Sequence, residues 1–398
     1  MASAATTEFR DASKKFHSST SRDVRTSEGI FFTPKKVRDL LFQRLGEIGV
    51  NRPKKVLEPS FGSGEFVYDA LQRYPGAEII GVEKNRELYE SVSNIPNMTC
   101  CDFMDWKGNA DLIIGNPPYF VIKPEKSRKK AMAACLTGRP NIYILFLYKC
   151  IAEHLDTDGH IAFVIPTSLF NCSYYQPMRD YIAANTTICH IEVLNKPGFY
   201  QTTQETMLII IQKRVGHDNY LFRTGGMTYI SPHYKALREL IRGTTTIEMV
   251  GLGVKTGCIV WNQNRDKLTE DNTATLLVYT KNIVKTESGY ELRKDVMTGE
   301  KKQYIRGTDK QVLSGPLILV DRGYGNVFDL RACLVDEPRF YAENHINVIY
   351  PKTAGAMCEL GRVIKSFMDP RSRQFIEWFV GNGTLSASNL LSVMPVFG

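Results

Sequence analysis

The sequence lacks the features of a secreted or membrane protein. Its nine cysteines are an odd number and none forms a Cys-x-x-Cys pair, which is typical of a reduced intracellular protein without disulfides or structural zinc. The seven histidines lack metal-ligand spacing, so no metal is expected. No apolar run approaches the ~20 residues that cross a bilayer, and no signal-like apolar core begins the chain. We therefore expect a soluble intracellular protein with no membrane partner.

A strong charge of one sign is also missing. Fifty Lys and Arg residues against 42 Asp and Glu residues give a formal net charge of +8. This mild basic excess is compatible with a phosphate-bearing partner, but many soluble proteins share it. A hydrophobic content of 43% and a charged content of 23% are ordinary globular values. The length of 398 residues suggests two or three domains, at roughly 150 residues for each.

Three regions follow one another along the chain. Residues 1–28 are polar, rich in Ser and Thr and without periodicity, which predicts a mobile or loosely docked tail. Residues 29–217 alternate helical patterns, such as 142–154, with apolar runs: KKVLEP, AEIIGVE, ADLIIGNPPY, HIAFVIP, ICHIEVL and MLIIIQK. Such runs fit buried strands of a mainly parallel sheet. They predict a doubly wound, Rossmann-like α/β domain that binds ligands beyond the carboxyl ends of its strands.

The texture changes after about residue 215. Gly, Thr, Asn and charged residues separate the shorter strand candidates TLLVYT, PLILVDRG and NVIYP, and a helical pattern follows near 358–368. We therefore expect residues 218–398 to form a second, smaller α+β domain.

The segment 56–66, VLEPSFGSGEF, predicts a strand, a glycine-containing turn and a helix. Small residues in such a turn let the backbone approach a ligand closely. A dinucleotide site would carry Gly-x-Gly-x-x-Gly, whereas only Gly62-Ser63-Gly64 stands here, preceded by Glu58. A carboxylate at that place would repel a pyrophosphate, but it suits the ammonium group of a methionine moiety.

Two later strand ends complete the pattern. Glu83 ends a second strand, where an acid can bind both hydroxyls of a ribose. Asp102 and Phe103 end a third segment and offer a carboxylate for an adenine amino group and a ring for stacking. The ordered set predicts an S-adenosylmethionine site and argues against a mere turn with two surface acids.

The segment 111–119, DLIIGNPPY, delivers Asn-Pro-Pro-Tyr at the end of an apolar strand. The two prolines fix the backbone and remove two N–H donors, so the segment offers acceptors. The Asn116 side-chain oxygen and the Pro117 carbonyl can accept both hydrogens of a target amino group, which aims the nitrogen lone pair at a methyl donor. Tyr119 offers a flat face on which an extruded base can stack, and such stacking contributes roughly 1–3 kcal/mol. A base inside a duplex must be flipped out to reach this site.

These ordered residues resemble class I methyltransferases and, more narrowly, the gamma-class (TaqI-type) DNA adenine-N6 methyltransferases of restriction–modification systems. Residues 29–34, GIFFTP, match a motif that precedes the cofactor loop in that family, although Ser60-Phe61 departs from the smaller residues usual there. The resemblance is strong from about Ile30 to Lys213 and looser beyond. It implies that Phe31 and Thr33 line the methionine end of the cofactor. The expected cofactor-binding set is Phe31, Thr33, Glu58, Pro59, Gly62, Gly64, Glu83, Lys84, Asp102, Phe103, Asn116 and Pro118.

The resemblance also implies a second aromatic face for the flipped adenine. The segment 196–201, KPGFYQ, stands at the matching place and makes Phe199 that ring, with Tyr200 as a close rival. The expected catalytic set is Asn116, Pro117, Tyr119 and Phe199. By the same resemblance the product would be S-adenosylhomocysteine, and the protein would act as a monomer on double-stranded DNA. A separate cognate restriction endonuclease would be a companion.

Basic residues suggest where DNA would bind. A run of five follows Tyr119 closely and favours phosphate contacts over a merely solvated loop; it comprises Lys123, Lys126, Arg128, Lys129 and Lys130. By resemblance the distal domain would recognise the target, with Lys301, Lys302, Arg306 and Arg322 as weaker candidates. For His345 we expect packing, with a DNA contact as the alternative.

Other functions share parts of this pattern. A protein-glutamine methyltransferase also presents a planar amino group to Asn-Pro-Pro-Tyr, but such enzymes end soon after the catalytic domain, whereas about 180 residues follow Val215 here. An RNA amino methyltransferase is poorly separated by the catalytic motifs. A catalytically silent DNA-binding protein is disfavoured by the intact motif 116–119.

Overall fold

The computed structural model divides the chain into two compact units. It describes residues 9–122, 135, 137–138, 141–194, 205–217, 219–294, 296–297, 299–323, 329–380 and 385–398. The first unit comprises Met1–Leu221 and Met227–Pro232, and the second comprises Phe222–Gly226 and His233–Gly398. The chain therefore passes from one unit to the other more than once. These crossings lie between residues 221 and 233, slightly after the predicted junction at residue 217. Within the described residues, no helix is both long and apolar enough to cross a membrane.

The described part of the first unit is built on a seven-stranded sheet of order β3-β2-β1-β4-β5-β7-β6. Its strands are β1 (Lys55–Glu58), β2 (Glu78–Glu83), β3 (Met98–Cys100), β4 (Ala110–Gly115), β5 (Leu155–Pro166), β6 (Thr187–Leu194) and β7 (Thr206–Gln212). All neighbours pair in parallel except β7, which is antiparallel to both β5 and β6. Each apolar run singled out in the sequence forms one of these strands. The predicted doubly wound, mainly parallel fold is confirmed.

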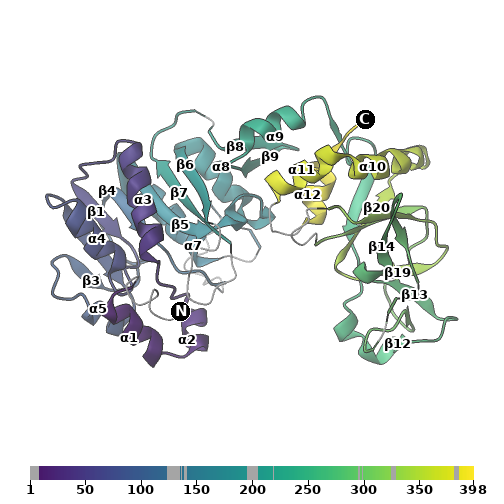
Figure 1. The fold of residues 1–398 in the computed structure, drawn as a ribbon, viewed down its shortest axis with the longest axis horizontal. Helices are drawn as coiled ribbons and strands as arrows, with labels where there is room; N and C mark the ends of the chain where they lie inside the picture. Colours follow the sequence, from purple (N-terminus) through teal and green to yellow (C-terminus); the bar gives the residue numbers. More distant parts are fainter. Residues whose placement is uncertain are drawn as a thin grey trace. The chain divides into compact units, whose positions relative to one another are not determined.

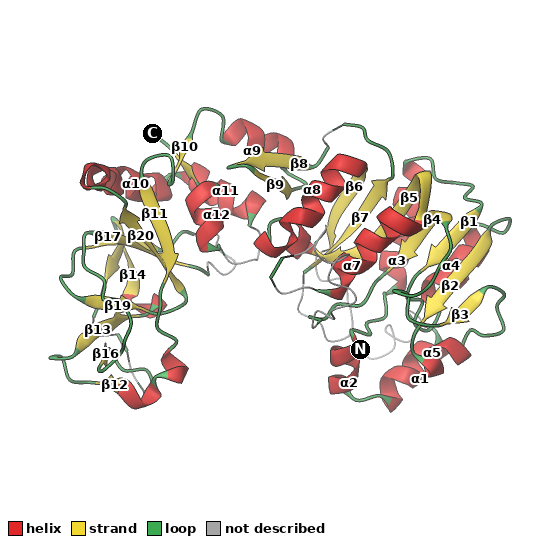
Figure 2. Ribbon diagram, turned by 180° about the vertical axis from the view of Figure 1, so that it is seen from behind, coloured by secondary structure: helices red, strands yellow, loops and turns green. Residues whose placement is uncertain are grey.

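Helices cover both faces of this sheet (Figure 1; Figure 2 from behind). One face packs against α3 (Lys35–Glu47) and α4 (Glu65–Arg73), and the other against α7 (Ile142–Lys149) and α8 (Gln176–Asn185). The strand residues are divided between two buried clusters accordingly: Val56 and Ile114 face α3 and α4, while Leu57 and Ile113 face α7. This two-sided burial explains the continuous apolar runs.

The N-terminal segment differs from the prediction of a loosely docked tail. Its described residues form α1 (Asp11–Ser19) and α2 (Arg22–Glu28), which are joined to the first unit. Phe9 and Phe16 are buried in a small cluster with Phe32 and Leu88. The prediction was wrong because the segment has only two widely spaced buried aromatic residues, which is too few to give a recognisable apolar pattern in the sequence. Its remaining buried groups are polar, such as Ser13, and a hydropathy pattern does not reveal polar residues that find partners on folding.

The second unit is rich in short strands. Two four-stranded sheets have the orders β11-β20-β17-β18 and β12-β16-β13-β19, and most neighbouring strands are antiparallel. These strands are β11 (Leu252–Thr256), β12 (Leu268–Thr269), β13 (Thr275–Val278), β16 (Tyr304–Ile305), β17 (Leu317–Asp321), β18 (Ala332–Val335), β19 (Phe340–Ala342) and β20 (Ile346–Pro351). Residues of both sheets share one buried core that includes Val278, Leu319 and Phe340. The three predicted distal strands are present as β13, β17 and β20.

Shorter elements complete the molecule. The remaining described α-helices are α5 (Arg86–Glu90), α9 (Tyr234–Leu240), α10 (Glu359–Met368), α11 (Pro370–Phe379) and α12 (Ala387–Ser392). The remaining described strands are β8 (Leu221–Thr224), β9 (Met227–Ile230), β10 (Thr245–Thr246), β14 (Ile283–Thr286), β15 (Gly289–Leu292) and β21 (Pro395–Val396). The helical pattern predicted near 358–368 corresponds to α10.

Candidate active site

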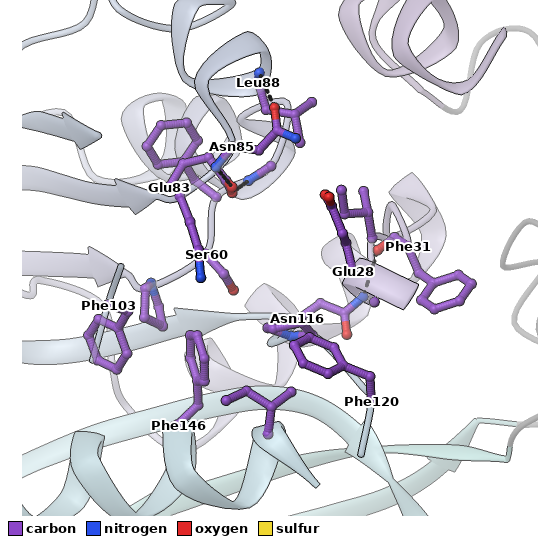
Figure 3. Close-up of a pocket in the computed structure, with 18 of the residues that line it drawn as sticks. Glu28, Phe31, Ser60, Glu83, Asn85, Leu88, Phe103, Asn116, Phe120 and Phe146 are labelled. Carbon is purple, nitrogen blue, oxygen red and sulfur yellow. Dashed lines mark hydrogen bonds between the residues drawn. The ribbon is translucent and has the colours of Figure 1, made fainter. Parts of the chain in front are cut away.

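A cavity of about 740 Å³ lies beyond the carboxyl ends of β1, β2 and β4 in the first unit (Figure 3). The predicted residues that line it are Phe31, Thr33, Glu58, Pro59, Gly62, Glu83, Lys84, Asp102, Phe103, Asn116 and Pro118. Gly64, Pro117 and Tyr119 belong to the same motifs but are not among the residues that line the cavity. The cavity occupies the place where doubly wound sheets bind their ligands.

Glu83 ties the end of β2 to the cofactor turn. One carboxylate oxygen accepts a hydrogen bond from Gly62 N (2.8 Å) and the other accepts one from Asn85 N (2.7 Å). Gly62 has a φ of +57°, in the left-handed region that favours glycine. Burial raises the pKa of Glu83, and the hydrogen bonds from the backbone oppose this shift only partly. Glu83 lines the cavity, and because a carboxylate oxygen can accept more than one hydrogen bond, it could also accept from a hydroxyl group of a ligand.

Glu58, at the end of β1, is a buried carboxylate with an unsatisfied oxygen. Its side chain is only 3% exposed, and its Oε2 has no hydrogen-bond partner among the described residues. Burial, followed by the nearby charge of Glu83, raises the pKa of Glu58 well above the usual glutamate range. The Ser60 hydroxyl is also buried and without a partner there. Buried polar groups are normally paired, so this corner of the cavity fits a ligand that carries a cation and a further polar group.

Phe103 and Phe146 give the cavity an aromatic wall. Phe103 stacks on Phe146 of α7, with ring centroids 4.9 Å apart and an interplanar angle of 28°. Asp102 and Lys84 form an ion pair of 3.1 Å beside them. Two stacked rings next to a carboxylate suit a flat heterocycle with an amino group.

Sequence reasoning missed several lining residues, among them Glu28, Asn85, Phe120, Ile142 and Phe146. For Phe146 the only signal was its place on the helix after the Asn-Pro-Pro-Tyr motif. Since nearly every residue of α7 is buried, no apolar stripe distinguishes the one ring that reaches the cavity.

Asn116 stands at the end of β4 with its amide group oriented. Its Nδ2 donates a hydrogen bond to the main-chain carbonyl of Phe31 (3.0 Å), which turns Oδ1 away from that carbonyl. The Tyr119 hydroxyl contacts Asn116 Oδ1 and also lies 2.5 Å from the Val164 carbonyl oxygen. An amide oxygen has two lone pairs, so Asn116 retains room for a further donor.

Tyr119 itself lies in the core in this structure. It is 9% exposed, packs edge-on against Tyr143 with centroids 6.0 Å apart, and burial raises its pKa well above the usual range. Its predicted stacking role is therefore not realised in the arrangement seen here, and it stays a prediction. Phe199 and Tyr200 lie outside the described residues, as do Lys123, Lys126, Arg128, Lys129 and Lys130.

The segment from Glu28 to Thr33 forms the wall of the cavity beside Asn116. Gly29 has a φ of +67°, and a Cβ atom there would lie 2.7 Å from Tyr119 N and 2.9 Å from a ring carbon of Phe120. Only glycine permits this approach. The motif near residue 30 and the Asn-Pro-Pro-Tyr motif are thus in direct contact.

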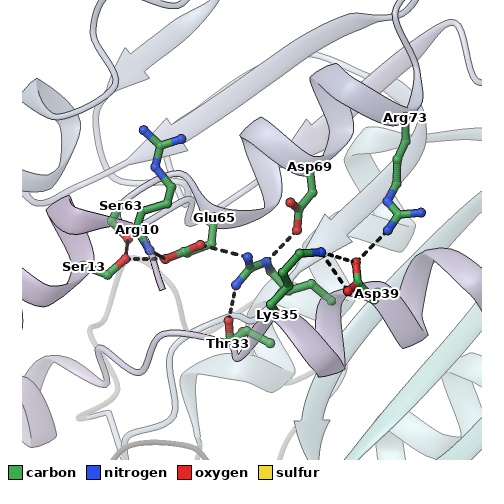
Figure 4. Close-up of polar contacts among 10 residues, drawn as sticks. Arg10, Ser13, Thr33, Lys35, Asp39, Ser63, Glu65, Asp69 and Arg73 are labelled. Atoms are coloured by element: carbon green, nitrogen blue, oxygen red, sulfur yellow. Dashed lines mark hydrogen bonds and ion pairs between the residues drawn. The ribbon is translucent and has the colours of Figure 1, made fainter. Parts of the chain in front are cut away.

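A buried polar network fixes this wall to the cofactor turn (Figure 4). Arg38 donates to the Thr33 carbonyl (2.6 Å) and pairs with Glu65 (3.0 Å) and Asp69 (2.6 Å). Ser13 of α1 donates to Glu65 Oε1 (2.5 Å) and lies 2.6 Å from the Ser63 hydroxyl. The network joins α1, α3, α4 and the turn that contains Gly62 and Gly64.

The distal basic candidates have protein partners in the second unit. Lys301 lies over the Trp261 ring (4.9 Å), while Lys302 and Arg306 pair with Glu270 and Asp271. Arg322 donates to the Asn344 carbonyl (3.1 Å). None of these contacts tests DNA binding, so the DNA contacts of these four residues stay predictions.

The expectation that His345 packs was wrong. Its side chain is 64% exposed, and its Nδ1 lies 2.8 Å from the buried carboxylate of Glu343. Glu343 thus satisfies one ring nitrogen, which allows the imidazole to stand at the surface.

The strand order, the reversed β7 and the cavity beyond the carboxyl ends of β1, β2 and β4 are those of the class I methyltransferase fold. The family model described as Eco57I restriction-modification methylase matches residues 71–199. The Type II methyltransferase M.CvrRI of Paramecium bursaria Chlorella virus XZ-6E is 31% identical over 98% of this chain and 99% of its own. The Modification methylase CviBIII of Paramecium bursaria Chlorella virus NC1A is 30% identical over the same shares. This chain therefore belongs to the type II DNA methyltransferases of restriction–modification systems, which use S-adenosylmethionine.

A bacterial relative matches part of the chain. The Type II methyltransferase M.AccI of Acinetobacter calcoaceticus is 30% identical over 47% of this chain and 36% of its own.

Proposed function

We propose that the protein is a gamma-class, site-specific DNA methyltransferase that methylates the exocyclic N6 of adenine in double-stranded DNA. The observation that carries this proposal is the setting of Asn116. Its amide is oriented by the Phe31 carbonyl, it follows β4 directly and it lines the cavity. An oriented acceptor at this place suits a planar amino group.

The cavity supports S-adenosylmethionine as the methyl donor. Glu58 Oε2 and the Ser60 hydroxyl have no partner among the described residues, and they suit its charged methionine end. Glu83 would hold the ribose, and the adenine would lie against the stacked rings of Phe103 and Phe146 beside Asp102. When bound, this cofactor supplies an electrophilic methyl group on a positively charged sulfur.

The protein's own groups would then prepare the nucleophile. Asn116 Oδ1 and the Pro117 carbonyl accept the two hydrogens of the target amino group, which localises the nitrogen lone pair otherwise shared with the ring. The lone pair would then form the new bond to the methyl carbon while the bond from that carbon to sulfur breaks, with its electron pair left on sulfur, and the nitrogen would afterwards lose one proton to solvent. Such acceptors act as preorganised electrostatic groups, whose removal costs on the order of 10²–10³ in rate.

Base extrusion would require Tyr119 to move. By resemblance Tyr119 and Phe199 hold the flipped adenine between two rings. The Tyr119 ring would leave its edge contact with Tyr143 and expose one face. The second unit would read the DNA sequence, with Lys301, Lys302, Arg306 and Arg322 as candidate contacts.

The test is methylation of adenine-containing DNA, followed by nucleoside analysis by mass spectrometry. The protein should produce N6-methyladenine, and Asn116→Ala should lower the single-turnover rate by about 100-fold or more. Asn109→Ala is the matched control, because Asn109 is exposed and pairs with Asp156 away from the cavity. Methylated glutamine in a protein substrate, with no methylated adenine in DNA, would overturn the proposal.

A further inference from the structure

Glu28 brings a further carboxylate into the cavity. It is the last residue of α2, and it lines the cavity together with Phe31 and Asn116. In Figure 3 Glu28 lies on the side of Asn116 and Phe31, while Phe103 and Phe146 lie at the other end. Residue 28 lies outside the motifs 29–34, 56–66 and 111–119, from which the cofactor site was predicted.

The backbone around Glu28 is held firmly against the Asn-Pro-Pro-Tyr motif. The next residue, Gly29, approaches Tyr119 N so closely that no Cβ atom would fit. Ile30 N donates to the Arg25 carbonyl (2.9 Å), and the Phe31 carbonyl accepts from Asn116. Glu28 is therefore positioned beside the place where a methyl group must meet the target nitrogen.

The Glu28 carboxylate has no ion-pair partner within the described ranges, and its side chain is exposed. The Glu28 carboxylate also acts on Glu83 electrostatically. Burial is the main cause of the raised pKa of Glu83, and repulsion from the Glu28 charge adds to that increase. Glu28 and Glu83 thus give the cavity a negative potential, to which Glu58 adds when it is ionised. Such a cavity favours a cation over a neutral ligand of the same shape.

We propose that Glu28 acts as an electrostatic partner of the cofactor's sulfonium group and sets the preference for S-adenosylmethionine over S-adenosylhomocysteine. The inference rests on the proposed function. The two molecules share the ammonium, the carboxylate and the nucleoside, and they differ at sulfur, which is a cation in the cofactor and a neutral thioether in the product. A carboxylate beside Asn116 attracts only the former. The loss of that attraction after transfer promotes release of the product.

Isothermal titration calorimetry on the full chain tests this inference with three ligands. These are S-adenosylmethionine, S-adenosylhomocysteine and sinefungin, which carries an ammonium group in place of the methylsulfonium. Glu28→Gln should weaken binding of both cationic ligands about three- to tenfold and change the product's affinity less than about twofold, as expected for one partly solvated charge pair. Added salt should reduce the wild-type preference and leave that of Glu28→Gln nearly unchanged.

Glu87→Gln is the matched control, since Glu87 is an exposed carboxylate on α5 outside the cavity lining; it should keep the wild-type preference. An unchanged preference in Glu28→Gln overturns the inference. An equal loss for all three ligands also overturns it, because the carboxylate would then act on a group that they share. If the wild-type protein bound none of the three, the proposed cofactor itself would be wrong, which is a distinguishable result.

Discussion

At the scale of single residues, the most unusual groups of the cavity are its two buried carboxylates. Glu58 and Glu83 are both nearly inaccessible to solvent, and burial raises the pKa of each. A carboxylate in such a place is costly to ionise until a cation or a set of donors arrives. The free protein therefore favours protonation of Glu58, whereas a bound ammonium group would favour its charged form.

The affinity for S-adenosylmethionine should consequently depend on pH. Because the free-state pKa of Glu58 is raised, binding releases a proton, and the affinity falls as the pH decreases through that raised value. Calorimetry over a range of pH, in buffers of different ionisation enthalpy, measures both effects. Glu58→Gln should bind more weakly and lose most of the pH dependence, whereas Glu78→Gln, an exposed partner of Lys55, should behave as wild type. An affinity that is constant with pH would contradict this assignment.

At the scale of helices and strands, Arg38 holds α3 and the cavity wall against the cofactor turn. This side chain is 5% exposed and faces two carboxylates, Glu65 and Asp69. It also holds the Thr33 carbonyl. The pairing of these charges keeps the cavity wall in register with the turn, although a buried ion pair of this kind is weak evidence for net stability.

Removing only the positive partner should be strongly destabilising. Arg38→Met leaves the buried Glu65 and the half-buried Asp69 without their cation, and we expect a loss of about 3–5 kcal/mol in the free energy of unfolding. Arg73→Met is the control, since Arg73 pairs with Asp39 at the surface and such pairs contribute about 0–1 kcal/mol. Urea unfolding of both variants measures the difference. Similar losses in the two variants would show that the buried network contributes no more to the free energy of unfolding than a surface ion pair does.

The division into two units is the main feature of the whole molecule, and β9 shows where the first unit ends. The strand Met227–Ile230 follows the predicted junction and still belongs to the first unit. Arg179, which is fully buried, donates to the Thr228 carbonyl (2.5 Å), and Ile230 N donates to the Phe170 carbonyl (3.0 Å). A chain cut before β9 therefore loses a buried partner of Arg179.

Truncation should separate cofactor binding from DNA recognition. A fragment of residues 1–232 should bind S-adenosylmethionine nearly as the full chain does, while its DNA binding should become weak, unspecific and steeply dependent on salt. A fragment of residues 1–213 should be less stable, because the buried Arg179 guanidinium lacks the Thr228 carbonyl. Thermal unfolding compares the fragments, and electrophoretic mobility shift with specific and scrambled duplexes tests recognition. Sequence-specific binding by residues 1–232 would contradict the proposed role of the second unit.

The sequence by itself predicted the sheet and much of the cavity lining. The central strands β1, β4 and β7 are runs of apolar residues that are mostly buried. The residues at the carboxyl ends of the parallel strands bring Glu58, Glu83, Asp102 and Asn116 to one edge. This was predictable because the pattern is local: a buried strand needs β-branched and aliphatic residues, and parallel strands place their carboxyl ends together.

Only the tertiary structure decided the rest. The docking of residues 9–28, the entry of Glu28 and Phe146 into the cavity and the burial of Tyr119 depend on contacts between residues far apart in the chain. A polar segment docks when its few buried groups find partners, as Ser13 does at Glu65, and nothing in its own sequence shows where those partners lie. Likewise, the position of a ring in an apolar helix depends on the neighbours that pack around it.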